Sequence, residues 1–406
     1  MENKMNSWKK TFYIISAGQA FSVLGSSVVQ FAIIWWLTVK TNSAIVLSVA
    51  SIAGFLPHAI LGPFIGAVVD RHSRKFIMIV ADLCIAAVTF VLIIIFFVGE
   101  PPVGIIYAAL ALRSLGSSFH TPAMQASIPM IVPEEKLTWA AGITQMIQSV
   151  SLILGPALAG LMLGMFEVQY VMLIDVLGAV IATITLLAIK IKDPVKSDED
   201  MNNKGILREI GYGIKSLMSY KGLFVLTIIS SIYMVIYIPV GSLFPLMVRG
   251  HFQGGAFHAS TVEAAFAAGM LIGSPVLGAI GAKLNRITII SLSILIMGAA
   301  LIVSGLLPVG AFIAFVILTA LMGFSSPLFA GSYFALLQSK IDPSILGRVM
   351  GVINSMMLIA SPVGLVVAGP GAEIIGIARW FLLSGILILI LGMACILNIS
   401  IKSIEN

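Results

Sequence analysis

Four ionisable residues fall inside stretches of the chain that are otherwise apolar: Asp82, Arg113, Asp175 and Glu263. At the centre of a membrane helix a charged side chain costs about 2.5–3.5 kcal/mol, so each should face a partner or a wet cavity. A carboxyl group that is exposed to two aqueous sides in turn can bind and release a proton. We predict proton coupling through Asp175 or Asp82, with Arg113 either tuning that acid or locking the helix packing. Glu263 opens its stretch, where a helix N-terminus favours a carboxylate without any further role.

The composition places most of the chain in lipid. Apolar residues make up 59% of the 406 residues and charged residues only 10%, with a mean hydropathy of +1.09. A soluble domain carries about a quarter of its residues as charges. Twelve stretches are long and apolar enough to cross a bilayer as helices of about 20 residues. We predict these spans at 12–38, 43–69, 76–98, 103–120, 137–165, 170–191, 222–247, 261–282, 287–307, 311–338, 345–371 and 376–399.

The distribution of positive charge orients these spans. With the N-terminus inside, most of the 23 lysines and arginines lie on the cytoplasmic side, as the positive-inside rule requires. We therefore expect both termini to be cytoplasmic. The first apolar stretch is long and lacks a cleavage site, so we interpret it as a retained helix. The predicted location is a bacterial plasma membrane, crossed many times.

An internal repeat and a polar connector indicate two halves. The segment 62–74 returns in weaker form at 274–286, and Arg71 and Arg74 correspond there to Lys283 and Arg286. Duplicated halves around a central path are typical of secondary transporters. We predict an N-terminal six-helix bundle at 12–191 and a C-terminal six-helix bundle at 222–399. The cytoplasmic linker at 192–221 should carry an amphipathic helix around 206–218.

One copy of the repeat keeps a complete charged loop. The string Gly66-x-x-x-Asp70-Arg71-x-x-Arg74-Lys75 resembles the loop 2–3 signature of the major facilitator superfamily, with Ser73 where that pattern has glycine. Gly66 permits close helix approach, and such a cluster can latch one conformation and release it in another. We predict a gating role for Gly66, Asp70, Arg71 and Arg74; the alternative is an ordinary positive-inside loop.

Two further motifs resemble the same superfamily. Gly155-Pro156-Ala157-Leu158-Ala159-Gly160 resembles its antiporter motif, which accompanies export, with Ala159 for one glycine. Pro156 removes a backbone hydrogen bond and bends the helix, so Gly155 and Pro156 join the predicted gating residues. A generic proline kink is the alternative. Arg113-Ser114-Leu115-Gly116 resembles the R-x-x-x-G element of the family, one residue compressed.

Polar, aromatic and soft apolar side chains on several spans offer a surface for a large amphipathic ligand. Each of them alone also fits ordinary packing, as Trp35 and Trp36 fit an interfacial aromatic belt. The predicted substrate-binding residues are Gln19, Gln30, Gln145, Gln148, Tyr233, Tyr237, Asn354 and Met357.

Several function classes lack their motifs. The chain has no Gly-Lys dipeptide, hence no phosphate-binding loop, and no His-Glu-x-x-His or Cys-x-x-Cys motif. We therefore predict no ATP use, no metal, no cofactor and no enzymatic activity. The expected partners are a small lipophilic drug, protons and the lipid bilayer, without nucleic acid, and the chain should act as a monomer.

Beyond the superfamily, the chain resembles the macrolide-efflux subfamily of bacterial facilitators nearly end to end, and also enterobactin exporters. The strings that carry this resemblance lie at 17–20, 54–57, 119–123, 132–135, 174–182 and 269–273. The resemblance implies proton-coupled export of hydrophobic drugs by alternating access, with macrolides as the leading substrate class. The alternatives are export of a siderophore or another endogenous metabolite, and a nontransporting sensor or scaffold.

Overall fold

The computed structural model describes residues 2–189, 215–281 and 284–404, and every regular element in these ranges is helical. The first half contains α1 (Glu2–Thr41), α2 (Ala44–Arg71), α3 (Arg74–Val98), α4 (Val103–Ile131), the 3₁₀ turn η1 (Glu134–Lys136), α5 (Leu137–Leu163) and α6 (Val168–Leu187). The second half contains α8 (Lys221–Ser242), α9 (Phe244–Leu246), the π-helical turn η2 (Met247–His251), α10 (Ala256–Ile280), α11 (Arg286–Leu306), α12 (Phe312–Lys340), α13 (Pro343–Ile375), α14 (Ile377–Leu397) and α15 (Ile399–Lys402).

Twelve of these helices are long, and they correspond one for one to the predicted spans. Eleven of them, within the described residues, are long and apolar enough to cross a membrane. The twelfth, α4, is 29 residues long and carries Arg113 and several hydroxyl side chains, which lower its hydropathy. The all-helical membrane fold predicted from the sequence is confirmed.

The predicted end of the fourth span was wrong. We expected it to stop at residue 120, whereas α4 continues to Ile131 with Pro122 and Pro129 inside it. Membrane helices tolerate proline because neighbouring helices and hydroxyl side chains satisfy the freed backbone groups. The apolar part of α4 therefore ends well before its helical backbone does. Most of the predicted linker helix at 206–218 lies outside the described residues. Its described part belongs to a helical segment at 215–219.

The chain divides into two compact units. The N-terminal unit contains α1, α2 from Val49 onward, α3 to α6, and Ala256–Ser260 at the start of α10. The C-terminal unit contains α8, α9, η2, the rest of α10 and α11 to α15, together with Asn42–Ser48. That short segment joins the second unit because Glu373 of α13 accepts hydrogen bonds from the backbone N–H of Ala44, at 2.8 Å, and from the hydroxyl of Ser43.

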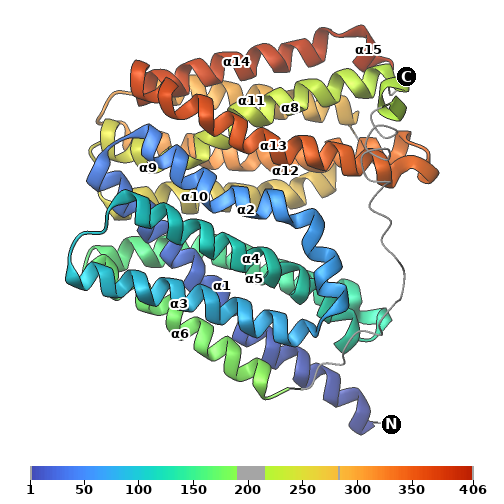
Figure 1. Cartoon of the computed structure of the whole chain (residues 1–406). Helices are drawn as coiled ribbons and strands as arrows, with labels where there is room; N and C mark the ends of the chain where they lie inside the picture. Colours follow the sequence, from blue (N-terminus) through green and yellow to red (C-terminus); the bar gives the residue numbers. More distant parts are fainter. Residues whose placement is uncertain (1, 190–214, 282–283, 405–406) are drawn as a thin grey trace. The chain divides into compact units, whose positions relative to one another are not determined.

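In the N-terminal unit, α1 lies against α5 and α6, and α3 lies beside α4 and α6 (Figure 1). Small residues permit the close contact of α1 with α6. A Cβ atom on Gly178 would lie 2.6 Å from the carbonyl oxygen of Phe21, and one on Gly25 would lie 3.0 Å from the Cα atom of Asp175. Glycines at such crossings let helix backbones approach closely, as is typical inside membranes.

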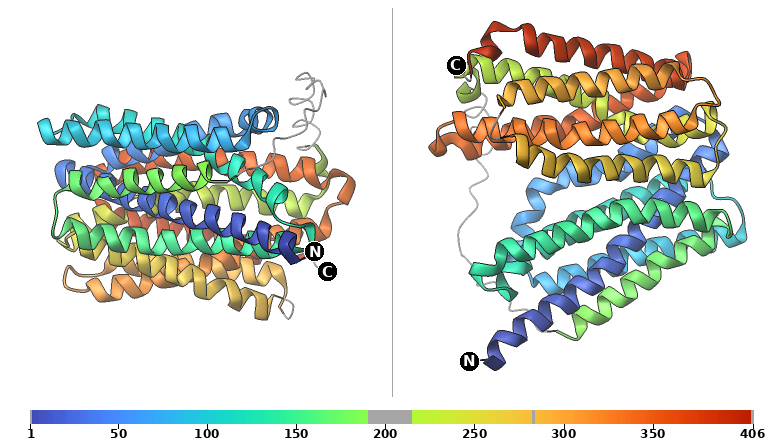
Figure 2. Two further views of the ribbon diagram at one scale, coloured as in Figure 1. Left: turned by 90° about the horizontal axis from the view of Figure 1, so that it is seen from below. Right: turned by 180° about the vertical axis from the view of Figure 1, so that it is seen from behind.

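In the C-terminal unit the closest packing joins a different pair. The helix α11 lies beside α14 and α12 (Figure 2), and a Cβ atom on Gly385 would lie 2.6 Å from the backbone nitrogen of Ile302. Aromatic rings fill much of the remaining interior. Phe315 stacks on Phe252 with ring centroids 5.0 Å apart, and Phe381 and Phe244 pack around them.

Candidate functional site

The N-terminal unit contains a buried ion pair that joins α4 to α6. The guanidinium of Arg113 donates to the carboxylate of Asp175, and the two residues are only 5% and 1% exposed. A charge pair in a low-dielectric interior holds its partners strongly, and removing one partner costs about 3–5 kcal/mol because the other charge stays buried. The sequence prediction left open which acid Arg113 faces; the structure pairs it with Asp175.

Two hydroxyl side chains complete the ion pair. Thr89 of α3 donates to Asp175 Oδ2 at 2.7 Å and also receives a hydrogen bond from Arg113. Ser26 of α1 donates to the other carboxylate oxygen, Oδ1, at 2.7 Å. Both oxygens of the carboxylate are therefore hydrogen-bonded, and four helices meet at this one group. Hydrogen bonds of this kind stabilise the charged form of a carboxyl group.

Close helix packing holds the cluster in place. Gly25 of α1 brings Ser26 against α6 at the level of Asp175. On the other side of α1, Gly155 of the predicted antiporter motif packs directly on Ser27. The next residue, Pro156, is buried inside α5. The motif therefore packs on the residue of α1 that follows Ser26.

A second buried polar cluster surrounds Asp82, which is 2% exposed. Ser22 of α1 donates to Asp82 Oδ1 at 3.1 Å, and the amide of Gln19 donates to Oδ2 at 3.5 Å. From α4, the His120 Nε2 atom lies 3.6 Å from Oδ1. The two candidate acids thus occupy separate clusters in the same unit.

The cations after the loop between α2 and α3 bind helix ends. Arg74, the first residue of α3, donates to the carbonyl oxygen of Ala126 in α4 at 2.6 Å. Lys75 donates to the carbonyl oxygen of Ile189, beyond the end of α6, at 2.6 Å. Cations are favourable near helix C-termini, where carbonyl groups lack partners. Gly66, Asp70 and Arg71 belong to the last turns of α2. The structure describes their helical backbone but not the surroundings of these three residues.

The predicted substrate residues of the N-terminal unit differ in exposure. Gln30, Gln145 and Gln148 are exposed on α1 and α5, where a ligand can reach them. Gln19 is buried and bonded to Asp82, so it belongs to the second cluster.

The predicted position of Glu263 was wrong. The sequence analysis put it at the start of its helix, whereas it lies two turns into α10.

The predicted substrate residues of the C-terminal unit include two stacked rings. Tyr233 and Tyr237 of α8 lie with ring centroids 5.4 Å apart and nearly parallel planes, and Tyr233 also packs on Phe329 of α12. Tyr233 is fully buried, whereas Tyr237 is partly exposed. On α13, Asn354 is exposed and Met357 partly exposed. Tyr237, Asn354 and Met357 therefore remain accessible candidates, and Tyr233 supports Tyr237.

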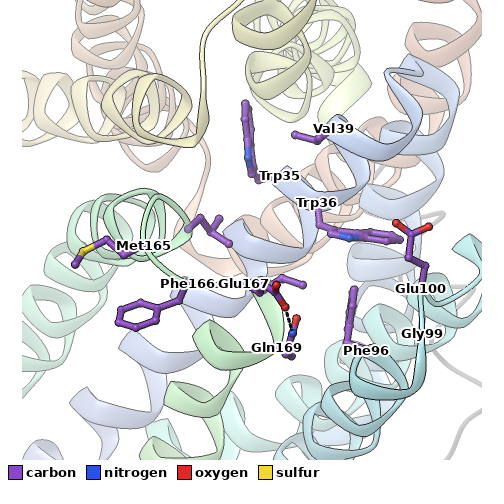
Figure 3. Close-up of a pocket in the computed structure, with 12 residues that line it drawn as sticks. Trp35, Trp36, Val39, Phe96, Gly99, Glu100, Met165, Phe166, Glu167 and Gln169 are labelled. Carbon is purple, nitrogen blue, oxygen red and sulfur yellow. Dashed lines mark hydrogen bonds between the residues drawn. The ribbon is translucent and has the colours of Figure 1, made fainter.

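A cavity of about 660 Å³ lies at the ends of α1, α3 and α5 and the start of α6. Figure 3 shows Trp36 beside Glu100, with Phe96 below, and the hydrogen bond between Gln169 and Glu167. The rings of Trp36 and Phe96 meet edge to face at 5.1 Å. Aromatic rings with a few polar groups are typical of a membrane interface, and the predicted orientation puts this cavity at the outer surface.

Sequence reasoning missed four residues of these clusters: Ser22, Ser26, Thr89 and His120. Spacing could have identified two of them. Thr89 follows Asp82 by seven residues on α3, and His120 follows Arg113 by seven on α4, so each pair lies on one helix face. Among the described residues, no group of three or more His, Cys, Asp and Glu side chains is arranged to hold a metal ion.

Comparison with known proteins shows the family. Residues 15–365 match the family model of the Major Facilitator Superfamily. The chain belongs to this superfamily of transporters. It is 46% identical over 403 residues to "Macrolide efflux protein A" of Streptococcus pyogenes, covering 99% of both chains. It is 26% identical over 399 residues to "Multidrug efflux pump Tap" of Mycobacterium tuberculosis, covering 96% of this chain and 94% of that one.

Solved structures support the fold. A bacterial homologue of the iron transporter ferroportin, crystallised in an inward-facing state, superposes with a TM-score of 0.73 at 16% identity, over 95% of this chain and 98% of that one. This facilitator is therefore a multi-pass transporter of the bacterial plasma membrane. The family and the relatives that it matches are transporters.

Proposed function

We propose that this facilitator exports hydrophobic drugs, first of all macrolide antibiotics, from the cytoplasm in exchange for protons. The observation that carries the proposal is the 46% identity to Macrolide efflux protein A over 99% of both chains. The relative named a multidrug efflux pump, matched over 96% of this chain, supports export as the direction. Both termini are cytoplasmic in this proposal, as the lysine and arginine distribution indicates.

The ion pair of the N-terminal unit supports proton coupling. When Asp175 is charged it holds Arg113, and with it α4 is bound to α6. Protonation of Asp175 removes one charge, so the attraction falls and the two helices can separate. Release of the proton restores the pair. A single proton thus switches a contact between two helices of the bundle.

Alternating access converts that switch into transport. Two six-helix bundles, 12–191 and 222–399, rock about the substrate while the linker 192–221 joins them. Arg74, which follows the α2 turns that carry Gly66, Asp70 and Arg71, donates to Ala126 of α4, the helix that also carries Arg113. Gly155, the residue before Pro156, packs on Ser27 of α1, next to Ser26. Both gating motifs therefore connect to the helices that hold Asp175.

The test is accumulation of a radiolabelled macrolide in drug-sensitive bacterial cells with and without the chain. We expect several-fold lower accumulation in expressing cells, and a protonophore should restore it to the level of control cells. If accumulation in expressing cells is the same with and without the protonophore, proton coupling is excluded. If expression leaves macrolide accumulation unchanged, the substrate assignment fails, and a panel of other lipophilic drugs and siderophores should be tested next.

A further inference from the structure

The clusters around Asp175 and Asp82 lie on the same faces of the same three helices. On α3, Thr89 of the first cluster follows Asp82 of the second by seven residues, and on α4 His120 follows Arg113 by seven. Two turns separate the clusters along these helices, about 10 Å at 1.5 Å per residue. On α1, Ser22 donates to Asp82 and Ser26, one turn later, donates to Asp175.

An apolar layer separates the two clusters. Ile85 of α3 is buried between Asp82 and Thr89, and Gly116 of α4 is buried between Arg113 and His120. The two meet closely, because a Cβ atom on Gly116 would lie 2.6 Å from Cγ1 of Ile85. The two polar groups therefore form two distinct stations. With the N-terminus inside, α3 runs outward, so the Asp82 station is nearer the cytoplasm.

The second station is incompletely bonded. Within the described part of the chain, His120 Nε2 and Gln19 Oε1 are buried and make no hydrogen bond. The His120 ring nitrogen lies 3.6 Å from Asp82 Oδ1, within reach of an ion pair but beyond a hydrogen bond. A buried polar atom without a partner is costly, and a proton on the imidazole would give His120 a full charge opposite Asp82.

The described side chains that face the Asp82–His120 pair come from α3 and α1. Asp82 of α3 faces His120, and α1 presents the neutral Ser22 and Gln19 to the same carboxylate. The helix α5, which follows α4, carries no Lys, Arg, Asp, Glu or His. Among ordinary side chains, only histidine changes charge between about pH 5 and 8. The pair therefore joins one carboxyl group of α3 and one imidazole of α4.

We propose that His120 and Asp82 form a second proton site of this transporter, on the cytoplasmic side of the Arg113–Asp175 pair. The proposal rests on the proposed proton-coupled function and extends it. His120 binds a proton of its own, becomes a cation paired with Asp82 and releases that proton to the cytoplasm, while Asp175 binds and releases a separate proton. The proton is the only species transferred, so charge is conserved at each step. Ser22 and Gln19 position the Asp82 carboxylate.

The experiment counts protons directly. Purified full-length protein in lipid nanodiscs, in weak buffer between pH 6 and 8, is mixed with a macrolide, and the protons released per bound drug are measured with a pH indicator. We expect His120→Gln to release about half as many protons as wild type, since one of two titrating sites is absent. The pH dependence of release should flatten in the same range. His251→Gln is the matched control, because His251 lies in the C-terminal unit and bonds the Leu307 carbonyl.

The outcomes separate the two proposals. If wild type releases no protons on binding the drug, proton coupling and the second site both fail. If wild type releases protons and His120→Gln releases the same number with the same pH profile, the second site alone is overturned. If His120→Gln does not fold, Asp82→Asn provides the comparison: it keeps the imidazole but removes its ion partner, and it should also lower the proton count. Unchanged release from a folded Asp82→Asn protein would overturn the proposal.

Discussion

The two compact units of this transporter use their interiors differently. The three charged side chains that are buried in the described residues, Asp82, Arg113 and Asp175, all lie in the N-terminal unit. Counted from the first residue of each corresponding helix, the C-terminal unit has Ile294 for Asp82, Met322 for Arg113 and Ser384 for Asp175. These substitutes are themselves buried. In the described residues, the buried charged groups are therefore confined to the N-terminal unit.

The C-terminal unit has a set of aromatic contacts in its interior. Tyr233, Tyr237, Phe329 and Tyr333 form a connected set of rings on α8 and α12. The hydroxyl of Tyr333 donates to Thr227 at 2.9 Å. Rings bury much apolar area and offer polarisable faces to a lipophilic ligand. In the proposed function this difference becomes a division of labour, with proton handling in the N-terminal unit and drug contact in the C-terminal unit through the partly exposed Tyr237.

Asp175→Asn should have the largest effect on this division. The amide leaves Arg113 buried without an ion partner, so we expect a loss of about 3–5 kcal/mol in stability and the loss of protonophore-sensitive efflux. Thermal unfolding in detergent and macrolide accumulation measure the two effects. The double variant Arg113→Gln with Asp175→Asn should regain stability but not coupled efflux. Gradient-driven efflux by folded Asp175→Asn would contradict the role assigned to the N-terminal unit.

A pair of glycine substitutions sharpens the comparison. Gly178→Ala and Gly385→Ala each place a Cβ atom 2.6 Å from a backbone atom of a neighbouring helix, and we expect each to cost about 1–3 kcal/mol. Only Gly178→Ala moves α6, and Asp175 with it, away from Ser26. The protons released per bound drug should therefore fall in Gly178→Ala and stay at the wild-type value in folded Gly385→Ala. Equal losses in both variants would show that proton handling is shared by the halves.

Tyr237→Phe should have the smallest effect. The variant keeps the ring that stacks on Tyr233 and removes only a hydroxyl that lies 3.4 Å from Ser326. We expect a stability change of about 0.5 kcal/mol and an unchanged proton count per drug. The macrolide susceptibility of expressing cells should change by about twofold, measured as the minimal inhibitory concentration. A change in the proton count would place proton handling in the C-terminal half as well.

The sequence was sufficient to predict the helices, because each bilayer crossing needs about 20 apolar residues. Eleven helices satisfy that requirement within the described residues. The error at α4 has a physical cause: hydropathy reports where the bilayer ends, whereas α4 stays helical to Ile131, past Pro122 and Pro129. Hydropathy thus predicted the number of long helices correctly but not the residue at which α4 ends.

The candidate site could be predicted only in part. Asp82, Arg113 and Asp175 were visible as charges inside apolar stretches, but their pairing depends on how α3, α4 and α6 rotate against one another. That rotation is set by contacts such as Gly116 with Ile85 and Gly178 with Phe21. The hydroxyl partners Ser22 and Ser26 gave no signal of their own, because serine and threonine are common in membrane helices and usually bond their own backbone.

The contact between Gly116 and Ile85 also bears on the leakage of protons across the membrane. A pump that joined its acids by one continuous wet path would let hydrogen ions flow inward whether or not it carried cargo, and would drain the membrane potential at rest. In the proposed mechanism, Ile85 packed against Gly116 interrupts such a path between α3 and α4. Many copies of such a protein can then sit idle in the membrane without wasting the energy that drives them.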